Sequence, residues 1–487
     1  MHNVYFGTDF NDVNDATLDD PRNVLVGTSQ TEATYQSADL LDYDTIYYWR
    51  IDDVNDLEPN SPWKGNVWSF TTVNYIVVDD FEDYNDYPPN EIFNTWVDGW
   101  GDPTNGSISG HPSPDFVGGE HYLEDEFVHG GDFSLPLYYD NSAGLSWATK
   151  TLTADKDWTV DDVITLSIFF YGDAQNEVVP MYVALDDYPI VTHPEPRAVM
   201  IAEWTRWDIL LQDLADMGVN LTNISSITLG FGDKANPTPG GKGRVFFDDI
   251  CLYRSQPEEY VPRPDSVNPG TNSLVAYYDF ENDVQDNSGR GRHGTASHNL
   301  SYINGATGFG SAVELNGVNQ YISLPIGSLI DLSDNITVAC WANFSNIGGS
   351  YQRLWDFGVA PPAGTDPNSY MFVTPRSGGT GPLQFSITTG GNGAESGIQG
   401  PATLPPGWHH VAASIDSSTM TMRLYQDGKL VAEGETSSLP SDLGVTDQNY
   451  IGRSQWTADA YYNGAIDELR IYDRVLAEAE ILFLMGW

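Results

Sequence analysis

The chain has 487 residues, 40% of them hydrophobic and 13% aromatic, and its 69 acidic and 21 basic residues give a net charge of −48. The apolar content is enough for packed cores, so the acidity does not make the chain disordered. Nucleic acids and anionic membranes are excluded as partners, because both are bound through Lys and Arg side chains.

The length suggests about three domains. The 47 Gly, 29 Pro, 27 Tyr and 14 Trp favour short strands joined by turns and predict an all-β chain. Cys251 and Cys340 lie in separate strand-like runs, which indicates buried thiols and no disulfide. The sequence has no apolar stretch of about 18 residues, so it predicts no membrane-spanning helix. The start lacks a signal-peptide pattern, so either an export signal lies upstream or the protein is not exported.

Residues 1–74 end in two strand-like runs, 47–51 and 67–72, and the run VYFGT lies near their start. These runs resemble the last two strands and the third strand of a fibronectin type III domain. Such a sandwich needs about 100 residues, so the resemblance implies a partial domain without its first two strands. Either the sequence is a fragment that starts inside the domain, or another subunit donates the missing strands. The second alternative implies a homo-oligomer or filament.

Residues 75–256 open with IVVDDFEDYND and close with GRVFFDDICLYR, two strand-like runs with adjacent carboxylates. Apolar runs lie between them, and the most specific is WDILLQDL ahead of VNLTNISSITLGFG. In this order the runs resemble the galactose-binding-like jelly roll of carbohydrate-binding modules, nearest to the family 11 type. Residues 257–272 follow with four prolines and predict an extended, semi-rigid linker.

Residues 273–487 carry five phrases in order: YYDFENDVQDNSGRGRHG, ELNGVNQYISLP, ITVACWANF, WHHVAASI and GAIDELRIYDRVL. Together they resemble the laminin-G-like, concanavalin-like or pentraxin-like jelly roll. We therefore expect an all-β, multidomain chain, with two β-sandwich jelly rolls after a partial fibronectin type III-like sandwich. The resemblance also implies a binding module in an extracellular or cell-surface protein.

The acidic strand ends are candidate calcium sites, because Ca²⁺ takes six to eight oxygen ligands and neutralises clustered carboxylates. In jelly rolls the first and last strands lie side by side, so DDFED is expected to meet FFDDI. The resemblance implies a structural Ca²⁺ on Glu82 and Asp249, with Asp80 as a further candidate. Strand alternation directs Asp248 and Asp249 to opposite faces, so one of the two is the expected ligand. The alternative is that both acidic strand ends are simply exposed.

The C-terminal unit offers a parallel case. Here the resemblance implies Ca²⁺ on Asp286 and Asp467. In the alternative, Asp467 and Glu468 only pair with Arg292 or Arg470.

No motif predicts catalysis. A retaining glycosidase needs two carboxylates about 5–5.5 Å apart, and no E-x-D-x-x-E or E-x-D-x-E strand occurs. A G-x-S-x-G elbow and an H-E-x-x-H zinc helix are also missing. His409 and His410 belong to the WHHV strand, where a structural role is expected. We therefore predict a non-enzyme, with a polysaccharide-degrading enzyme such as a lyase as an alternative.

Sugar-binding surfaces need flat, rigid aromatic side chains. The candidates in the middle unit lie in or near Gly-rich loops and are Trp96, Trp100, Tyr122 and Tyr139. Those in the C-terminal unit are Tyr351, Trp355, Trp456 and Tyr461. A loop aromatic can equally serve as a local packing plug.

Two functions of different classes are compatible with the sequence. The first is a non-catalytic, modular, extracellular protein that binds a polysaccharide or glycan, as the C-terminal part of a larger secreted or cell-surface bacterial polypeptide. The second is a structural or adhesive surface or filament protein, whose β-domains mediate protein–protein contacts.

Overall fold

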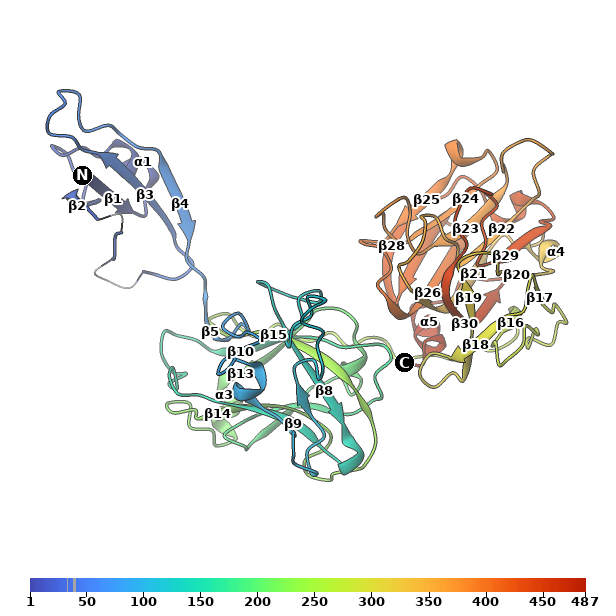
Figure 1. Ribbon diagram of the computed structural model, residues 1–487, viewed down its shortest axis with the longest axis horizontal. Helices are drawn as coiled ribbons and strands as arrows, with labels where there is room; N and C mark the ends of the chain where they lie inside the picture. Colours follow the sequence, from blue (N-terminus) through green and yellow to red (C-terminus); the bar gives the residue numbers. More distant parts are fainter. Residues whose placement is uncertain (33, 38–40) are drawn as a thin grey trace.

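The structure, a computed structural model, describes residues 1–32, 34–37 and 41–487. Three β-rich bodies follow one another along the long axis, and the C-terminus lies where the second and third bodies meet (Figure 1). We call them the N-terminal domain (1–74), the middle domain (75–256) and the C-terminal domain (273–487). The predicted all-β, multidomain fold class is confirmed.

The described part of the N-terminal domain is one antiparallel sheet with the short helix α1 (Phe10–Asp15) on one face. Its strand order is β2 (Leu25–Gln30), β1 (His2–Gly7), β3 (Ile46–Asp53) and β4 (Val67–Thr71). The strands expected from VYFGT, 47–51 and 67–72 are therefore neighbours. Whether the domain belongs to the fibronectin type III type stays a prediction.

The two faces of this sheet differ. On the α1 face Arg50 is buried and donates to the backbone oxygens of Val13 and Ala16 and to the Asp52 carboxylate. On the other face aromatic rings stack, including Phe6 on Tyr47 at a centroid distance of 5.0 Å. We call this the aromatic face, and it consists of Phe6, Tyr47, Trp49, Ile51, Trp68 and Phe70. Trp68 on it is 61% exposed, so the aromatic face lacks a full cover from the described residues.

The middle domain is a β-sandwich of two antiparallel sheets. One has the order β13 (Thr205–Leu210), β10 (Thr165–Tyr171), β15 (Lys242–Tyr253), β8 (Leu135–Asp140) and β7 (Ile108–Ser109), with β5 (Tyr75–Asp79) also paired to β15. The other has the order β12 (Ile190–Thr192), β11 (Met181–Leu185), β14 (Ser226–Phe231), β9 (Ser146–Thr151) and β6 (Trp96–Val97). The short helices α2 (Ile92–Thr95) and α3 (Leu211–Asp216) connect strands.

The C-terminal domain is a larger sandwich of the same kind. Its first sheet has the order β18 (Ser301–Asn304), β19 (Ser311–Asn316), β30 (Asn463–Tyr472), β21 (Ile336–Phe344), β26 (Gly407–Asp416), β27 (Thr421–Gln426) and β28 (Lys429–Glu435), with β16 (Leu274–Tyr278) on β30. The second has the order β17 (Thr295–Ala296), β20 (Ile322–Ser323), β29 (Gln448–Ile451), β22 (Trp355–Gly358), β23 (Tyr370–Thr374), β24 (Gln384–Thr388) and β25 (Ser396–Gln399). Its α-helices are α4 (Gly327–Ile330) and α5 (Glu478–Leu484).

The first and last strands of each jelly roll pair as expected, β5 with β15 and β16 with β30. Both last strands carry a bulge at their acidic pair, where Asp249 has φ 43° and Glu468 has φ 52°. A bulge interrupts the alternation of side chains. The rule that adjacent carboxylates face opposite sides therefore does not hold at these positions.

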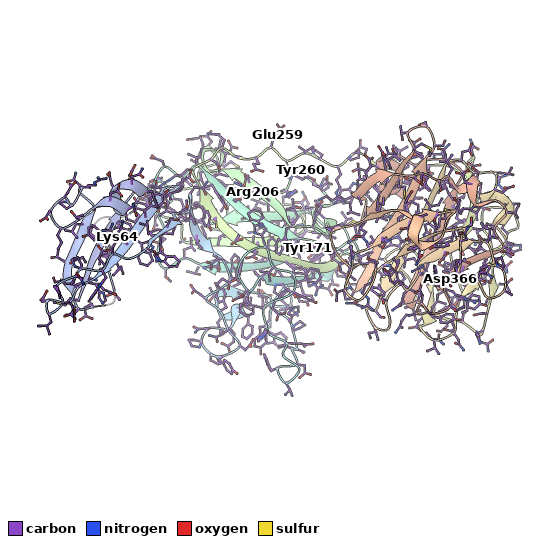
Figure 2. All side chains as sticks on the ribbon, turned by 90° about the horizontal axis from the view of Figure 1, so that it is seen from above. Lys64, Tyr171, Arg206, Glu259, Tyr260 and Asp366 are labelled. Carbon is purple, nitrogen blue, oxygen red and sulfur yellow. The ribbon has the colours of Figure 1, made fainter. Side chains whose placement is uncertain are left out.

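The proline-rich segment forms no helix or strand, as predicted, but it does not hold the domains apart. Figure 2 shows Glu259 and Tyr260 on this segment as it crosses from the middle to the C-terminal domain. Arg263 binds Glu203 of the middle domain and the backbone oxygen of Asp427 in the C-terminal domain, both at 3.0 Å. The expectation of a spacer is wrong, because the segment packs against both domains.

Apolar side chains of the C-terminal domain extend the hydrophobic core of the middle domain. They are Ala306, Trp341, Leu482, Met485 and Trp487. Nearby, Thr307 donates its backbone N–H to Gln175 at 2.6 Å. The two domains thus share a buried interface, and the N-terminal domain contacts the middle domain more sparsely, for example through Arg254 over the Tyr43 ring.

The cysteines are free and buried, as predicted. His409 and His410 are also buried, with His409 Nδ1 2.7 Å from Asp427 Oδ2. Within the described ranges, no helix is both long enough and apolar enough to cross a membrane.

Candidate functional site

An aromatic groove of about 390 Å³ lies on the middle domain, and we call it the Trp100 groove. Its lining residues come from α2, β6, β7 and the loops that follow: Phe93, Val97, Asp98, Trp100, Ile108, Ser109, His111, Pro112 and Tyr122. Trp100 is 83% exposed, and the Phe93 and Tyr122 rings meet edge to face at 5.0 Å. The groove thus brings two of the predicted aromatic residues, Trp100 and Tyr122, onto one surface.

Polar groups of the Trp100 groove are held in place by the surrounding chain. Asp98 accepts the backbone N–H of Trp100 at 2.8 Å and that of Ser109 at 2.7 Å, so it fixes the loop that carries Trp100. His111 lies with Nδ1 2.9 Å from Tyr138 Oη and Nε2 3.1 Å from Glu124 Oε2. Burial works against the Glu124 charge, but hydrogen bonds from His111 and from backbone N–H groups lower its pKa. The groove is therefore preorganised.

Gly99 explains why the Trp100 loop can turn so tightly. A Cβ atom at this position would lie 2.0 Å from the backbone oxygen of Asn105, well inside contact distance. Only glycine fits such a close backbone approach. The loop therefore folds back on itself and projects the Trp100 ring into solvent.

A second groove, of about 350 Å³, lies on the outer face of the second sheet of the C-terminal domain. We call it the Trp456 groove, and it is lined by Tyr351, Arg353, Phe372, Gln384, Asn392, Glu395, Trp456 and Asp459. An adjoining hollow of about 60 Å³ shares Trp456 and Asp459 and includes Tyr461. Three predicted aromatic residues, Tyr351, Trp456 and Tyr461, are thus gathered in one region.

The floor of the Trp456 groove is charged and buried. Arg353 is 2% exposed, and its guanidinium lies 3.1 Å from Asp356 Oδ2 and 3.0 Å from Asp459 Oδ2. The hydroxyl of Tyr370 donates to Glu395 at 2.7 Å. Burial raises the pKa of Asp356 to about 6 and also raises the pKa values of Glu395 and Asp459. Three carboxyl groups therefore surround one guanidinium.

The carboxylates at the β5–β15 junction already have protein donors. Glu82 accepts the backbone N–H groups of Asp132 and Phe133, and Asp249 Oδ2 lies 2.6 Å from His129 Nδ1. Asp80 accepts the backbone N–H of Glu82, at 3.4 Å. Asp248, the fully buried member of the pair, accepts from His129 and Gly130, and burial raises its pKa to about 7.

The β16–β30 junction of the C-terminal domain has the same arrangement with fewer donors. Asp467 is fully buried and its Oδ2 accepts the backbone N–H of Ala306 at 3.2 Å, while its Oδ1 has no hydrogen-bond partner among the described residues. Burial raises its pKa to about 8, and the charges of Glu468 and Glu281 contribute. Glu468 also pairs with Arg470, as the alternative without metal expects.

Asp286 lies apart from this set. It accepts backbone N–H groups from Tyr277, Ser288 and Arg292, so both of its oxygens serve the turn after β16. Glu281, which the sequence argument did not select, is the carboxylate near Asp467. Across the described parts of the chain, no three His, Cys, Asp or Glu side chains converge to hold a metal ion.

Three predicted sugar-contacting aromatics are buried, and for them the prediction is wrong. Trp96 is fully buried and donates its indole N–H to Asp79 at 2.7 Å. Tyr139 is 2% exposed and donates to the backbone oxygen of Glu177. Trp355 is 1% exposed and stacks on Phe357 inside the C-terminal core. Each ring fills space between sheets, so none can offer a face to a sugar.

Residues 316–482 match the sequence family described as the concanavalin A-like lectin/glucanases superfamily. The match lies within the C-terminal domain, which we call the concanavalin A-like domain after this similarity. This confirms the laminin-G-like, concanavalin-like resemblance for that part of the chain. No curated protein matches the sequence.

The solved structures similar to the chain include three domains of larger proteins. Domain 4 of an extracellular GH43 arabinanase from Geobacillus stearothermophilus, in complex with arabinotriose, is 25% identical with a TM-score of 0.36, over 44% of this chain and 98% of that one. The CBM40 of the Ruminococcus gnavus IT-sialidase, bound to α2,3-sialyllactose, is 14% identical with a TM-score of 0.31, over 36% and 96%. The binding domain of Paraclostridial Mosquitocidal Protein 1 is 15% identical with a TM-score of 0.33, over 44% and 52%. TM-scores this low assign neither a fold nor a ligand.

Proposed function

We propose that the chain is a non-catalytic, extracellular carbohydrate-binding protein. The observation that carries the proposal is the Trp100 groove, where the exposed Trp100 ring stands beside Tyr122 and Phe93 with fixed polar groups at hand. Pyranose rings pack their C–H faces on such aromatic side chains, while polar groups bind the hydroxyls. A preorganised groove keeps the entropic cost of binding low.

A glycan array tests this proposal. The intact chain is compared with Trp100→Ala and with Tyr87→Ala, a control in the same domain that removes a ring 74% exposed and outside the groove. We expect glycan binding by the wild type and Tyr87→Ala and a loss of binding in Trp100→Ala. An array without any bound glycan contradicts the proposal, and release of shortened products from a bound polysaccharide contradicts its non-catalytic part.

The proposal includes a structural calcium ion at one location, the β16–β30 junction. Asp467 is buried, its Oδ1 lacks a donor, and the charges of Glu281 and Glu468 act on it. Ca²⁺ also takes backbone oxygens and water, so a few carboxylates suffice. A structural Ca²⁺ bound by Asp467 together with backbone oxygens and water would neutralise the strand ends. At the β5–β15 junction protein donors already serve Glu82 and Asp249, so calcium there stays a prediction of the sequence.

The aromatic face of the N-terminal domain favours a second candidate function, a structural or adhesive protein that associates with a second copy. The side chains of this face are uncharged, and Trp68 and Phe70 on it are 61% and 41% exposed. An apolar sheet face of this kind marks an interaction surface. Two copies can bury it against each other despite the net charge, because none of its six residues carries a carboxylate. Sedimentation velocity of the intact chain separates this candidate from a monomeric binding protein.

A further inference from the structure

We propose that the Trp456 groove selects a sugar that carries a free, protonated amino group, such as a residue of a polymer of 2-amino-2-deoxyhexose. The inference rests on the proposed carbohydrate-binding function and adds the chemical class of the ligand at a second site. It follows from three observations on the groove: how its only basic side chain is used, which hydrogen-bonding groups lack partners, and where aromatic rings lie.

The basic side chain of the groove lining is not free to bind an anion. The Arg353 guanidinium is held by the carboxylates of Asp356 and Asp459 and donates to the backbone oxygen of Tyr351 at 2.6 Å. Its carbon also lies 3.9 Å from the centroid of the Phe372 ring. All three nitrogens of the group thus donate within the protein, and one of its faces lies on the Phe372 ring. An anionic sugar, such as a uronate or a sulfated sugar, would be repelled by Glu395 and would find no free cationic side chain among the lining residues.

Negative charge exceeds positive charge in the groove. Asp356, Asp459 and Glu395 surround the single Arg353, and burial raises the pKa values of all three carboxyl groups. Burial disfavours the charged forms of these carboxyl groups, and the charge of Arg353 offsets this only in part. A ligand ammonium placed in the groove would supply a second positive charge.

The groups without hydrogen-bond partners beneath the groove are acceptors. Asp356 Oδ1 and Gln455 Oε1 are buried and find no donor among the described residues. They belong to one network, because the backbone N–H of Gln455 donates to Asp356 Oδ2 at 3.1 Å. A buried acceptor without a donor is costly. Neither residue lines the groove, but these oxygens add negative potential beneath it, which favours a cationic ligand group such as –NH₃⁺, a donor without acceptors.

Aromatic rings complete the match to an amino sugar. Tyr351, Phe372 and Trp456 line the groove, and Tyr351 is 38% exposed. A ring face attracts both the C–H groups of a pyranose and a nearby cation. The Trp100 groove carries less negative charge. Its titratable lining residues are Asp98, His111 and Tyr122, so it has a single carboxylate. The net charge of −48 adds long-range attraction for a polycation and repulsion of acidic polysaccharides.

The experiment is calorimetric titration of the intact chain with three hexasaccharides that share a β-1,4 backbone. They are the hexamers of glucosamine, N-acetylglucosamine and glucose, used at one pH at which the amines are protonated. We expect the glucosamine hexamer to bind at least about tenfold more tightly than the two neutral hexamers, as one charged hydrogen bond provides. Equal affinities for the three hexamers overturn the inference.

Variants then locate the binding. Glu395→Gln keeps an oxygen for the Tyr370 hydroxyl but removes the charge, and it should lower the affinity for the glucosamine hexamer about tenfold. Trp456→Ala should abolish the preference, and Trp100→Ala should leave it unchanged. If the preference persists in Glu395→Gln and Trp456→Ala, the amine is attracted by the acidic surface at large and the inference is wrong. If only neutral glycans bind, through Trp100, the proposed function stands without the inference.

Discussion

Glu281 of the concanavalin A-like domain occupies the same place in its domain as Glu82 does in the middle domain. Each follows a Phe with positive φ after the first strand, and each accepts a backbone N–H from a Gly-containing loop, that of Ser311 for Glu281 and that of Asp132 for Glu82. Each lies near a bulged acidic pair on the last strand. Two jelly rolls of different size thus join their terminal strands with the same set of carboxylates.

Removal of calcium should destabilise the concanavalin A-like domain. A bound ion that favours the native state stabilises it by mass action, so a chelator should lower the melting temperature of that transition by several degrees. Thermal unfolding with added calcium or chelator measures this. Asp467→Asn should make the transition insensitive to both additions. The assignment to this junction fails if the variant still responds to calcium as the wild type does.

Acid should destabilise the middle domain through His193. This ring is 3% exposed, packs among Phe170, Trp207 and Tyr260, and accepts the backbone N–H of Glu195. Burial lowers its pKa to about 4 from 6.5, so the unfolded chain takes up a proton at a higher pH than the folded one. The stabilisation is present above pH 6.5 and is lost as the pH falls toward 4, by on the order of 3 kcal/mol.

The matched variant is His193→Asn, whose side-chain oxygen can replace Nδ1 as the acceptor. Urea unfolding at pH 7 and pH 4.5 should show a smaller loss of stability for the variant than for the wild type. The Glu195 carboxylate and the Tyr260 hydroxyl, 3.4 Å apart beside the ring, are unchanged in both proteins. An identical loss in the two proteins would show that His193 does not govern the acid response.

Arg263 should couple the middle and concanavalin A-like domains. Its guanidinium bonds Glu203 and the Asp427 backbone and lies 5.0 Å from the centroid of the Trp487 ring. Arg263→Ala should cost about 1–3 kcal/mol of interface stability and speed proteolytic cleavage within 257–272. Arg290→Ala, which loses only a 3.5 Å contact with Asn272, is the control. Equal cleavage rates for both variants would mean that the segment is held by other contacts.

The aromatic face should determine whether the chain associates. If two copies cover it, Trp68→Ser should shift the sedimentation coefficient of the wild-type dimer to that of a monomer. Trp63→Ser, which removes another exposed ring of the same domain, should leave the dimer intact. A wild-type chain that is monomeric at high concentration excludes the second candidate function in this form.

The strand pairing was predictable from sequence, whereas the bulges were not. DDFED and FFDDI lie at the ends of one domain, and their juxtaposition follows from the jelly-roll topology. Asp249 and Glu468 have positive φ although neither is a glycine, so no residue type marks the bulges in the sequence. Strand alternation alone therefore could not show that Asp248 and Asp467 are the fully buried members of their pairs.

The exposure of aromatic residues was predictable only in part. Trp96 and Trp100 are four residues apart, yet one is fully buried and the other 83% exposed. The difference comes from Asp79, a distant residue on β5 that accepts the Trp96 indole N–H. The Trp456 groove could not be predicted from the sequence either. Its charged residues Arg353, Glu395 and Asp459 come from three separate loops, and only the fold brings them together.

The affinity of the Trp100→Ala variant for the best neutral glycan of the array tests the central claim most directly. Truncation of an exposed aromatic anchor should raise the dissociation constant at least about tenfold, with an unchanged melting temperature. Tyr87→Ala should bind as the wild type does. A Trp100→Ala variant with wild-type affinity would contradict the account, because the sugar would then bind elsewhere.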